Sequence, residues 1–405
     1  MYYTKRILTF LAAVAFLLLF ACQNAKKTGE ERWSEKMARS EMNRFPGLWM
    51  IENASSPKWS YTFGLVATSM IELWEETGDR VWFDYAKGYA DSLITDRGVI
   101  KTYSMDSYNI DHVCPGNILF DLYAETGDPR YKMAIDTLFT QLENHPRTSA
   151  GGFWHKLRYP HQMWLDGIYM ASPFLSRYAK TFNEPALFDD VIRQVTLIDG
   201  YTFDKESGLF YYGWDESREQ GWADNETGTS PGFWTRSMGW YGAAIVDVLD
   251  YLPENHPGRE NVLEIAGRLA SGIARYQDPE SGVWYQVTDQ GDREGNYLES
   301  SGSSLFVYFL AKALNNNYVD EKYRKVALAG FDGIVNNFIR LEDNGTYTIT
   351  NCCAVAGLGG KGITGHPRDG SFEYYISEPV IDNDPKSTGS FILAAIEVER
   401  LKENM

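Results

Sequence analysis

The segment Glu125-Thr-Gly-Asp128 repeats an earlier one, Glu76-Thr-Gly-Asp79, and each lies between two segments with helical spacing of apolar residues. Before the earlier turn, for example, Phe63, Val66 and Met70 recur at intervals of three and four. Because that spacing places side chains on one face of a helix, it predicts an amphipathic helix. A glycine directly after such a segment indicates the end of the helix. The repetition therefore predicts pairs of helices joined by tight turns.

The same pattern continues through the chain, and no Pro/Ser-rich linker interrupts it. It predicts six helix pairs, at residues 62–74 with 81–93, 112–123 with 131–142, 163–179 with 185–195, 237–252 with 259–277, 303–313 with 321–338, and 389–401 with the N-terminal segment 31–44. Six pairs indicate an all-α fold, an (α/α)6 barrel of inner and outer helices. An open solenoid is the alternative. We favour the barrel because the N-terminal helix would complete the last pair.

A second motif, a glycine turn followed by alternating aromatic residues, recurs in the connections between pairs. It occurs at residues 149–155, 206–212, 280–285 and 343–347. Such alternation predicts short strands. In a barrel of helix pairs these loops would meet at one mouth, where we expect a ligand to bind.

The N-terminus has the features of an export signal. Lys5 and Arg6 precede an almost unbroken apolar run from residue 7 to residue 20, and Cys22 follows it. This arrangement resembles a bacterial lipoprotein signal, in which the cysteine becomes the lipidated first residue. We therefore expect a signal peptide over residues 1–21, a tether over 22–31 and a single catalytic domain over 32–405. An ordinary secretory signal is the alternative. The expected location is lipid-anchored and periplasm-facing.

The composition narrows the possible partners. A net charge of −17 argues against nucleic acid, although local arginine and histidine residues can still bind an anionic sugar. Aromatic residues make up 15% of the chain, which suits a large core and also the stacking of sugar rings. After Cys22 only Cys114, Cys352 and Cys353 remain, too few for a disulfide scaffold, and no Cys/His spacing suggests a structural zinc site.

One short segment, His161-Gln-Met-Trp-Leu-Asp166, combines apolar residues with an imidazole, an indole and a carboxylate. We interpret it as an apolar helical run. An ionised carboxylate at Asp166 would be costly unless it binds a partner or holds a proton. The alternative is that Asp166 caps a helix that Pro173 breaks. The crowding of further rings favours a ligand pocket; they belong to Trp154, His155, His161 and Trp164.

Polar residues at the predicted starts of inner helices form a candidate site. They are Asp111, His161, Asp166 and Arg236, with Trp240 one turn later and with His155, Tyr212 and Trp214 in nearby loops. Two acids, an arginine and several rings at one mouth suit carbohydrate chemistry. A structural alternative for Arg236 is an ion pair with Asp111 or Asp215.

From Trp33 to Leu401 the chain resembles the unsaturated rhamnogalacturonyl hydrolases of glycoside hydrolase family 105, which are related to the unsaturated glucuronyl hydrolases of family 88. The resemblance is carried by Trp154-His155, His161-Gln-Met-Trp-Leu-Asp166, Phe233-Trp-Thr-Arg-Ser-Met-Gly-Trp240, and Asp369-Gly-Ser-Phe-Glu-Tyr-Tyr-Ile-Ser-Glu-Pro379 with Asn383-Asp384.

The resemblance also implies roles for individual residues. Asp166 matches the catalytic acid/base and Asp111 the second active-site carboxylate, whereas the sugar-contacting positions are matched by His155, Trp164, Arg236 and Trp240. We add His161 and Tyr212 as candidate substrate-binding residues. The family usually has His-Gly-Trp where this chain has Tyr212-Gly-Trp214, which leaves the preferred sugar open.

The implied reaction removes a 4,5-unsaturated uronic acid from the non-reducing end of an oligosaccharide, here of the pectin or rhamnogalacturonan type, by hydration of the C4=C5 bond. It requires no metal and no organic cofactor. We expect burial and the neighbouring Asp111 to raise the pKa of Asp166. Alternatives are an unsaturated β-glucuronyl hydrolase for ulvan, arabinogalactan or glycosaminoglycan fragments, and a non-catalytic glycan-binding lipoprotein. We expect a monomer or a weak homodimer.

Overall fold

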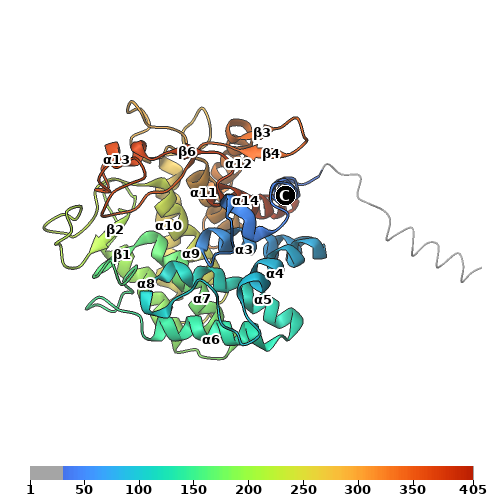
Figure 1. Ribbon diagram of the computed structural model, residues 1–405. Coiled ribbons are helices and arrows are strands. Elements are labelled where there is room, and N and C mark those ends of the chain that lie inside the picture. The colour runs from blue at the N-terminus through green and yellow to red at the C-terminus, as the bar shows by residue number, and fades with distance from the viewer. Residues whose placement is uncertain (1–30, 405) are drawn as a thin grey trace, which may run out of the picture. The chain divides into compact units, whose positions relative to one another are not determined.

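The computed structural model describes residues 31–404, and from Trp33 onward the chain is one compact unit. The predicted signal peptide, Cys22 and the tether, apart from Glu31, lie outside the described residues. Helices surround a common axis (Figure 1). The inner helices are α3 (Tyr61–Thr77), α5 (Asn117–Thr126), α7 (Leu165–Thr181), α9 (Thr235–Leu249), α11 (Ser300–Asn315) and α14 (Pro385–Glu403).

Each inner helix packs against the next one along the chain, and α14 packs against both α11 and α3, so the ring returns to its first member. The outer helices are α4 (Arg80–Leu93), α6 (Pro129–Glu143), α8 (Leu187–Thr202), α10 (Arg259–Arg275), α12 (Arg324–Phe338) and α2 (Trp33–Arg44). The N-terminal helix α2 packs on α14, as predicted for the last pair. The prediction of an all-α fold of six helix pairs is confirmed.

The repeated turn has the same geometry in both places. Gly78 and Gly127 adopt the left-handed backbone conformation, with φ of 69° and 68°, which ends the first helix of each pair. The aspartate that follows caps the second helix: the side chain of Asp79 accepts a hydrogen bond from the amide of Val81, and that of Asp128 one from Arg130. The four residues of the turn therefore determine where the first helix of the pair ends and where the second begins.

The inner helices approach one another closely where one of them carries glycine. A Cβ on Gly239 of α9 would lie 2.6 Å from Cβ of Leu305 on α11, and a Cβ on Gly389 of α14 would lie 2.8 Å from Leu65 on α3. The glycines thus permit the tight packing of a ring in which almost every residue of α9, α11 and α14 is buried.

Two boundaries that the sequence suggested are wrong. The second inner helix begins at Asn117 and not at residue 112, because residues 110–116 form two short 3-10 turns, Ile110–His112 and Cys114–Gly116. The helix end at Pro173, which belonged to the capping alternative for Asp166, does not occur either: that proline lies inside α7, which continues to Thr181, and the predicted helix over 163–179 already included it.

The described strands are short and form three antiparallel pairs. β1 (Gln162–Trp164) pairs with β2 (Gly213–Asp215), β3 (Ile339–Leu341) with β4 (Tyr347–Ile349), and β5 (Cys352–Cys353) with β6 (Val380–Ile381). The short helix α13 (Phe372–Ser377) lies with β3, β4 and β6 at the upper edge of the view in Figure 1. Of the four predicted aromatic strands, only the last contributes to a strand pair, and the others make isolated bridges.

Candidate functional site

The site is organised by the junction of β1 and α7. The predicted helical run over 161–164 is wrong, because Gln162–Trp164 pairs with β2 in the register Trp164 opposite Gly213. The helix starts at Leu165, with Trp164 in the capping position, so Asp166 lies in its first turn and is not the N-cap. The strand pair brings Tyr212, which directly precedes β2, beside Asp166.

Asp166 is a largely buried acid, with 15% of its side chain exposed. Its Oδ2 accepts a hydrogen bond of 3.1 Å from the hydroxyl of Tyr212. Its Oδ1 lies 3.9 Å from Nδ1 of His155 and makes no hydrogen bond within the described part of the chain. Burial raises the pKa of Asp166 to about 7, and the negative charge of Asp111 adds to the effect. Asp166 can therefore hold a proton near neutral pH.

Asp111 has the opposite protonation. It pairs with the ammonium group of Lys156, and its Oδ1 lies 3.3 Å from Nε2 of His155. Burial disfavours the ionised form, but the charge of Lys156 outweighs it, helped by His155, and lowers the pKa of Asp111. The site thus holds one ionised carboxylate and one that is readily protonated, the usual signature of an acid–base pair.

Aromatic rings enclose these carboxyl groups. The indole of Trp164 stacks on the imidazole of His155, with ring centroids 4.3 Å apart, and on Tyr159 at 4.9 Å. Tyr212 lies 5.3 Å from Trp164 and edge-on to Trp234 at 5.0 Å. Burial lowers the pKa of His155 to about 3, so its imidazole is neutral.

The structure does not place His161 with these groups. Its side chain is 46% exposed, lies 3.6 Å from Glu216 and packs against Trp154. The residue adopts a left-handed backbone conformation, φ 65°, directly before β1. His161 and Trp154 therefore form an outer rim.

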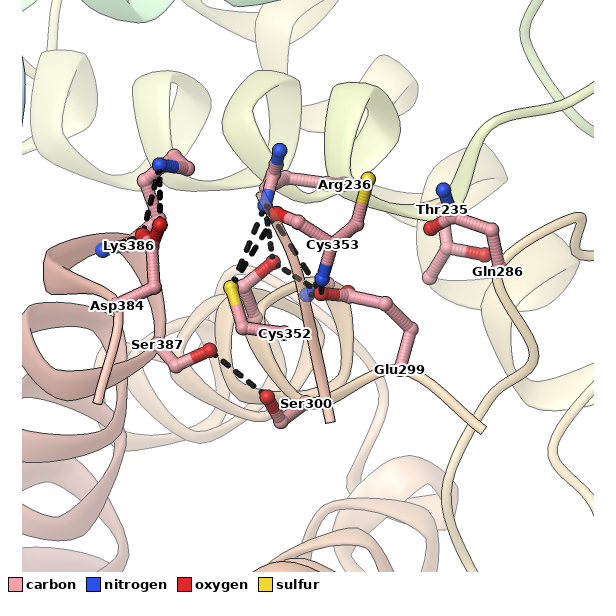
Figure 2. A network of polar contacts seen from close by, with 12 residues as sticks. Thr235, Arg236, Gln286, Glu299, Ser300, Cys352, Cys353, Asp384, Lys386 and Ser387 are labelled. Atoms are coloured by element: carbon pink, nitrogen blue, oxygen red, sulfur yellow. Dashed lines mark hydrogen bonds and ion pairs between the residues drawn. The ribbon is translucent and has the colours of Figure 1, made fainter. Parts of the chain in front are cut away.

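Arg236 and Trp240 are more deeply buried in the protein than residues that contact a substrate are expected to be. Arg236 is 1% exposed, and its Nη1 donates a hydrogen bond to the carbonyl oxygen of Cys353 (Figure 2). The same nitrogen donates a second hydrogen bond to Oγ of Ser301. Its acidic neighbour is Glu299, at 3.9 Å, so the predicted alternatives Asp111 and Asp215 are wrong. Trp240 is also buried. Its ring packs 4.7 Å from Tyr169 and 6.4 Å from Tyr61.

A cavity of about 830 Å³ opens between the starts of α3 and α14. Tyr61, Lys386, Arg44 and Asn383 are among the residues that line it, whereas Asp166 is not. Tyr61 connects the cavity with the site, because its ring contacts Trp240 and its pKa, raised by burial to about 12, is influenced by Arg236 and Asp111. The lining of the cavity carries both positive and negative side chains, among them Arg44, Lys386 and Asp384.

Sequence reasoning missed Lys156. The one available signal was its position directly after Trp154-His155, inside the motif itself. In the structure its ammonium group pairs with Asp111 and partly opposes the raised pKa of Asp166. Lys156 therefore lowers the pKa of both carboxyl groups, and its effect prevails over burial only at Asp111.

Residues 31–404 show neither a metal-binding cluster nor a membrane-spanning helix. They hold no cluster of three or more histidine, cysteine or acidic side chains that could bind a metal ion. None of their helices combines the length and the apolar character that a membrane span requires. The three cysteines in this range, Cys114, Cys352 and Cys353, are buried free thiols.

Comparison with known proteins identifies the family. Residues 33–402 match Glycosyl Hydrolase Family 88. The chain belongs to this family. It is therefore a glycoside hydrolase.

Similar proteins agree with this assignment. A protein of Agrobacterium fabrum is 36% identical over 232 residues, which cover 56% of this chain and 97% of that protein. The unsaturated rhamnogalacturonyl hydrolase YesR of Bacillus subtilis is 27% identical over 255 residues, 61% of this chain and 68% of YesR. A solved C. acetobutylicum glycoside hydrolase from family 105 has a TM-score of 0.86 and 41% identity, covering 91% of this chain and 99% of that one.

Asp111→Asn tests the coupling between the two carboxyl groups. Because the charge of Asp111 helps to raise the pKa of Asp166, the variant should lose activity at a lower pH on the basic side of its kcat/KM profile. Asp136→Asn, which changes a half-exposed carboxylate on α6, is the control and should leave the profile in place. A higher KM with an unmoved basic limb would mean that Asp111 only hydrogen-bonds the sugar.

Tyr212→Phe should move the basic limb in the other direction. The hydroxyl of Tyr212 stabilises the ionised form of Asp166 and so lowers its pKa; without it, Asp166 keeps its proton to higher pH, and turnover weakens. Tyr212→His should change the preference among unsaturated uronides. Tyr211→Phe, whose ring stacks on Phe233, is the control. If the position 212 variants match wild type on every substrate, Tyr212 is only a packing residue.

Proposed function

We propose that this glycoside hydrolase removes 4,5-unsaturated uronic acid from the non-reducing end of oligosaccharides left by polysaccharide lyases, of the pectin or rhamnogalacturonan type. The observation that carries the proposal is the pair of carboxyl groups on either side of His155, with the pKa of Asp166 raised by burial to about 7 and the pKa of Asp111 lowered by the charge of Lys156. The similarity to YesR supports the choice of substrate class.

The reaction begins at the C4=C5 bond, which is an enol ether because the ring oxygen is bonded to C5. Asp166 donates its proton to C4, and the positive charge that develops is shared by C5 and the ring oxygen. Water adds to C5 and returns a proton to the carboxylate of Asp166. The hemiketal formed at C5 then opens, and the neighbouring sugar leaves from C1 with its oxygen.

The surrounding residues support these steps. Ionised Asp111 stabilises the positive charge and adds to the effect of burial in raising the pKa of Asp166 in the free enzyme. Neutral His155 fixes Asp111 through Nε2, and the Trp164 ring stacked on it presents an apolar wall to the sugar. The hydroxyl of Tyr212 orients Oδ2 of Asp166, so that Oδ1, which has no protein hydrogen bond in the described residues, is the oxygen left for substrate.

A second candidate substrate class comprises unsaturated glucuronides from ulvan, arabinogalactan or glycosaminoglycans. Tyr212 favours it, since it stands where the resembled enzymes have histidine and contacts the catalytic carboxyl group directly. A third reading, a glycan-binding lipoprotein without activity, predicts binding with no turnover. The presence of the carboxyl group of Asp166, which the reaction requires, argues against a protein without activity.

The deciding experiment follows the loss of alkene absorbance with purified protein on a panel of lyase products. Turnover of unsaturated rhamnogalacturonan fragments in preference to glucuronides supports the first class, and the reverse order supports the second. Binding of any of them without a fall in absorbance would overturn the hydrolase proposal.

We also propose that the chain is exported and lipid-anchored through Cys22. The supporting features are the basic Lys5-Arg6 pair and the apolar run that follows it. Cys22→Ser should move the protein from the membrane fraction to the soluble fraction of the producing cells. An unchanged distribution would refute the anchor.

A further inference from the structure

A second cavity, of about 270 Å³, lies next to the site and outside the mechanism described above. Its walls come from two segments, the loop after β2 and the loop between β5 and α13. The lining residues are Gln220, Gly221, Trp222, Gly359, Gly360, Pro367, Arg368 and Asp369. The cavity has room for a single pyranose ring.

Trp222 lines this cavity and carries a buried hydrogen-bond donor that has no partner among the described residues. The residue is only 5% exposed, and its Nε1 is buried without a hydrogen-bond partner among the described residues. A Cβ on Gly359 would lie 3.8 Å from this nitrogen, so the nitrogen lies next to the glycine wall of the cavity. An unmade hydrogen bond at a buried donor is costly, which makes Trp222 Nε1 a position where a ligand oxygen would bind favourably.

Arg368 contributes further donors. The structure assigns no hydrogen bond to its guanidinium group within residues 31–404, and its Nε lies 3.8 Å from Oε1 of Glu378. Gly357 shows where the guanidinium group lies. A Cβ on this glycine would lie 3.4 Å from Nη1 of Arg368 and 3.8 Å from Cζ3 of Trp164. The guanidinium group and the indole that stacks on His155 therefore both lie close to Gly357, and Trp222 packs in one buried cluster with Trp164 and Tyr212 of the site.

The charges around the cavity decide which ligand fits. Glu378 is completely buried and balances the charge of Arg368, and Asp369 contributes a second carboxylate to the lining. The cavity thus offers donors without surplus positive charge. A carboxylate or sulfate would face the charge of Asp369, whereas uncharged hydroxyl groups can accept from Trp222 and Arg368 and donate to Asp369.

We propose that Trp222 and Arg368 bind the sugar that leaves, the residue attached to C1 of the unsaturated uronic acid, and that this residue is uncharged. The inference rests on the proposed function, because it places the neighbouring sugar next to the uronic acid at Asp166. It identifies two specificity-determining residues that do not touch the reacting atoms.

The test compares two substrates, an unsaturated uronide linked to an uncharged sugar and the methyl glycoside of the same unsaturated uronic acid. The measured quantity is the ratio of kcat/KM for the disaccharide to kcat/KM for the methyl glycoside. Trp222→Phe keeps the ring and removes the N–H, so the ratio should fall about 3- to 10-fold, mainly through KM. Arg368→Gln should lower it roughly 10- to 100-fold.

Arg293→Gln is the matched control, since this half-exposed arginine stacks on Phe372 of α13 and pairs with Glu373; its ratio should equal that of wild type. Equal losses on both substrates in the Trp222 and Arg368 variants, or no loss on either, would overturn the inference while wild-type turnover of the methyl glycoside still upholds the proposed function. Failure of wild type on both substrates would overturn both.

A third substrate tests the charge argument. Sulfation of the second sugar should lower wild-type kcat/KM about tenfold or more, and Asp369→Asn should recover part of that loss. A wild-type enzyme that prefers the sulfated substrate would contradict the assignment of an uncharged sugar.

Discussion

Asp166→Asn should lower kcat by on the order of 10²–10⁴ or more, because the amide can neither protonate C4 nor take a proton from water. The measurement is the loss of alkene absorbance on a substrate that wild type is shown to turn over. Binding of that substrate, followed calorimetrically, should persist, since the amide keeps the shape of the carboxyl group. Turnover at the wild-type rate would remove Asp166 from the mechanism.

The same variant should change stability in a pH-dependent way. The folded-state pKa of Asp166, about 7, lies above that of an unfolded aspartate, so the stability it contributes is present at low pH and is lost as the pH rises toward 7. Asparagine removes this dependence. Relative to wild type, the variant should therefore gain stability between pH 4 and pH 8, as chemical denaturation at both values would show.

Arg236→Met should destabilise the fold by about 3–5 kcal/mol, the usual cost of removing one partner from a buried ion pair. The guanidinium group joins α9 to the carbonyl oxygen of Cys353 on β5 (Figure 2) and to Ser301 on α11. Its loss leaves Glu299, which is completely buried, without its cation. Denaturant unfolding gives the free energy directly.

Arg193→Met is the control for this prediction. That arginine is 51% exposed and lies 3.5 Å from Asp190, so its removal should cost about 1 kcal/mol or less. If the Arg236 variant keeps wild-type stability but loses affinity for substrate, the residue serves the sugar and the buried network is incidental.

Helical periodicity was sufficient to predict the six pairs, because each inner helix buries apolar residues at regular spacing and each glycine turn marks an end. It was not sufficient at Met163-Trp164. A short apolar run fits a strand as well as a helix. Residues 162–164 form a strand because they pair with β2, some fifty residues later in the chain. The position of Asp166 in the first turn of α7 follows from that pairing.

The sequence was sufficient to predict those features of the site that depend on neighbouring residues. It was not sufficient for those that depend on residues distant in the chain. The motif around Asp166 pointed to a buried carboxyl group, and its raised pKa follows from burial. The partner of Arg236 was assigned wrongly because Glu299 carries no motif and is 63 positions away. The sequence predicted that His161 lies at the mouth of the barrel with the other site residues. Its backbone is left-handed, φ 65°, and its side chain faces outward.

The packing of α14 against both α11 and α3, which closes the ring, has a consequence for how the chain folds. The last helix, α14, fills the gap between α11 and α3 and also carries α2, with the hydroxyl of Ser34 bound to Glu399 across almost the whole sequence. A chain synthesised from its N-terminus holds α2 and α3 without their partner until the final twenty or so residues emerge. Such long-range closure predicts slow, late folding, and a ribosome-bound chain that lacks α14 should remain sensitive to protease.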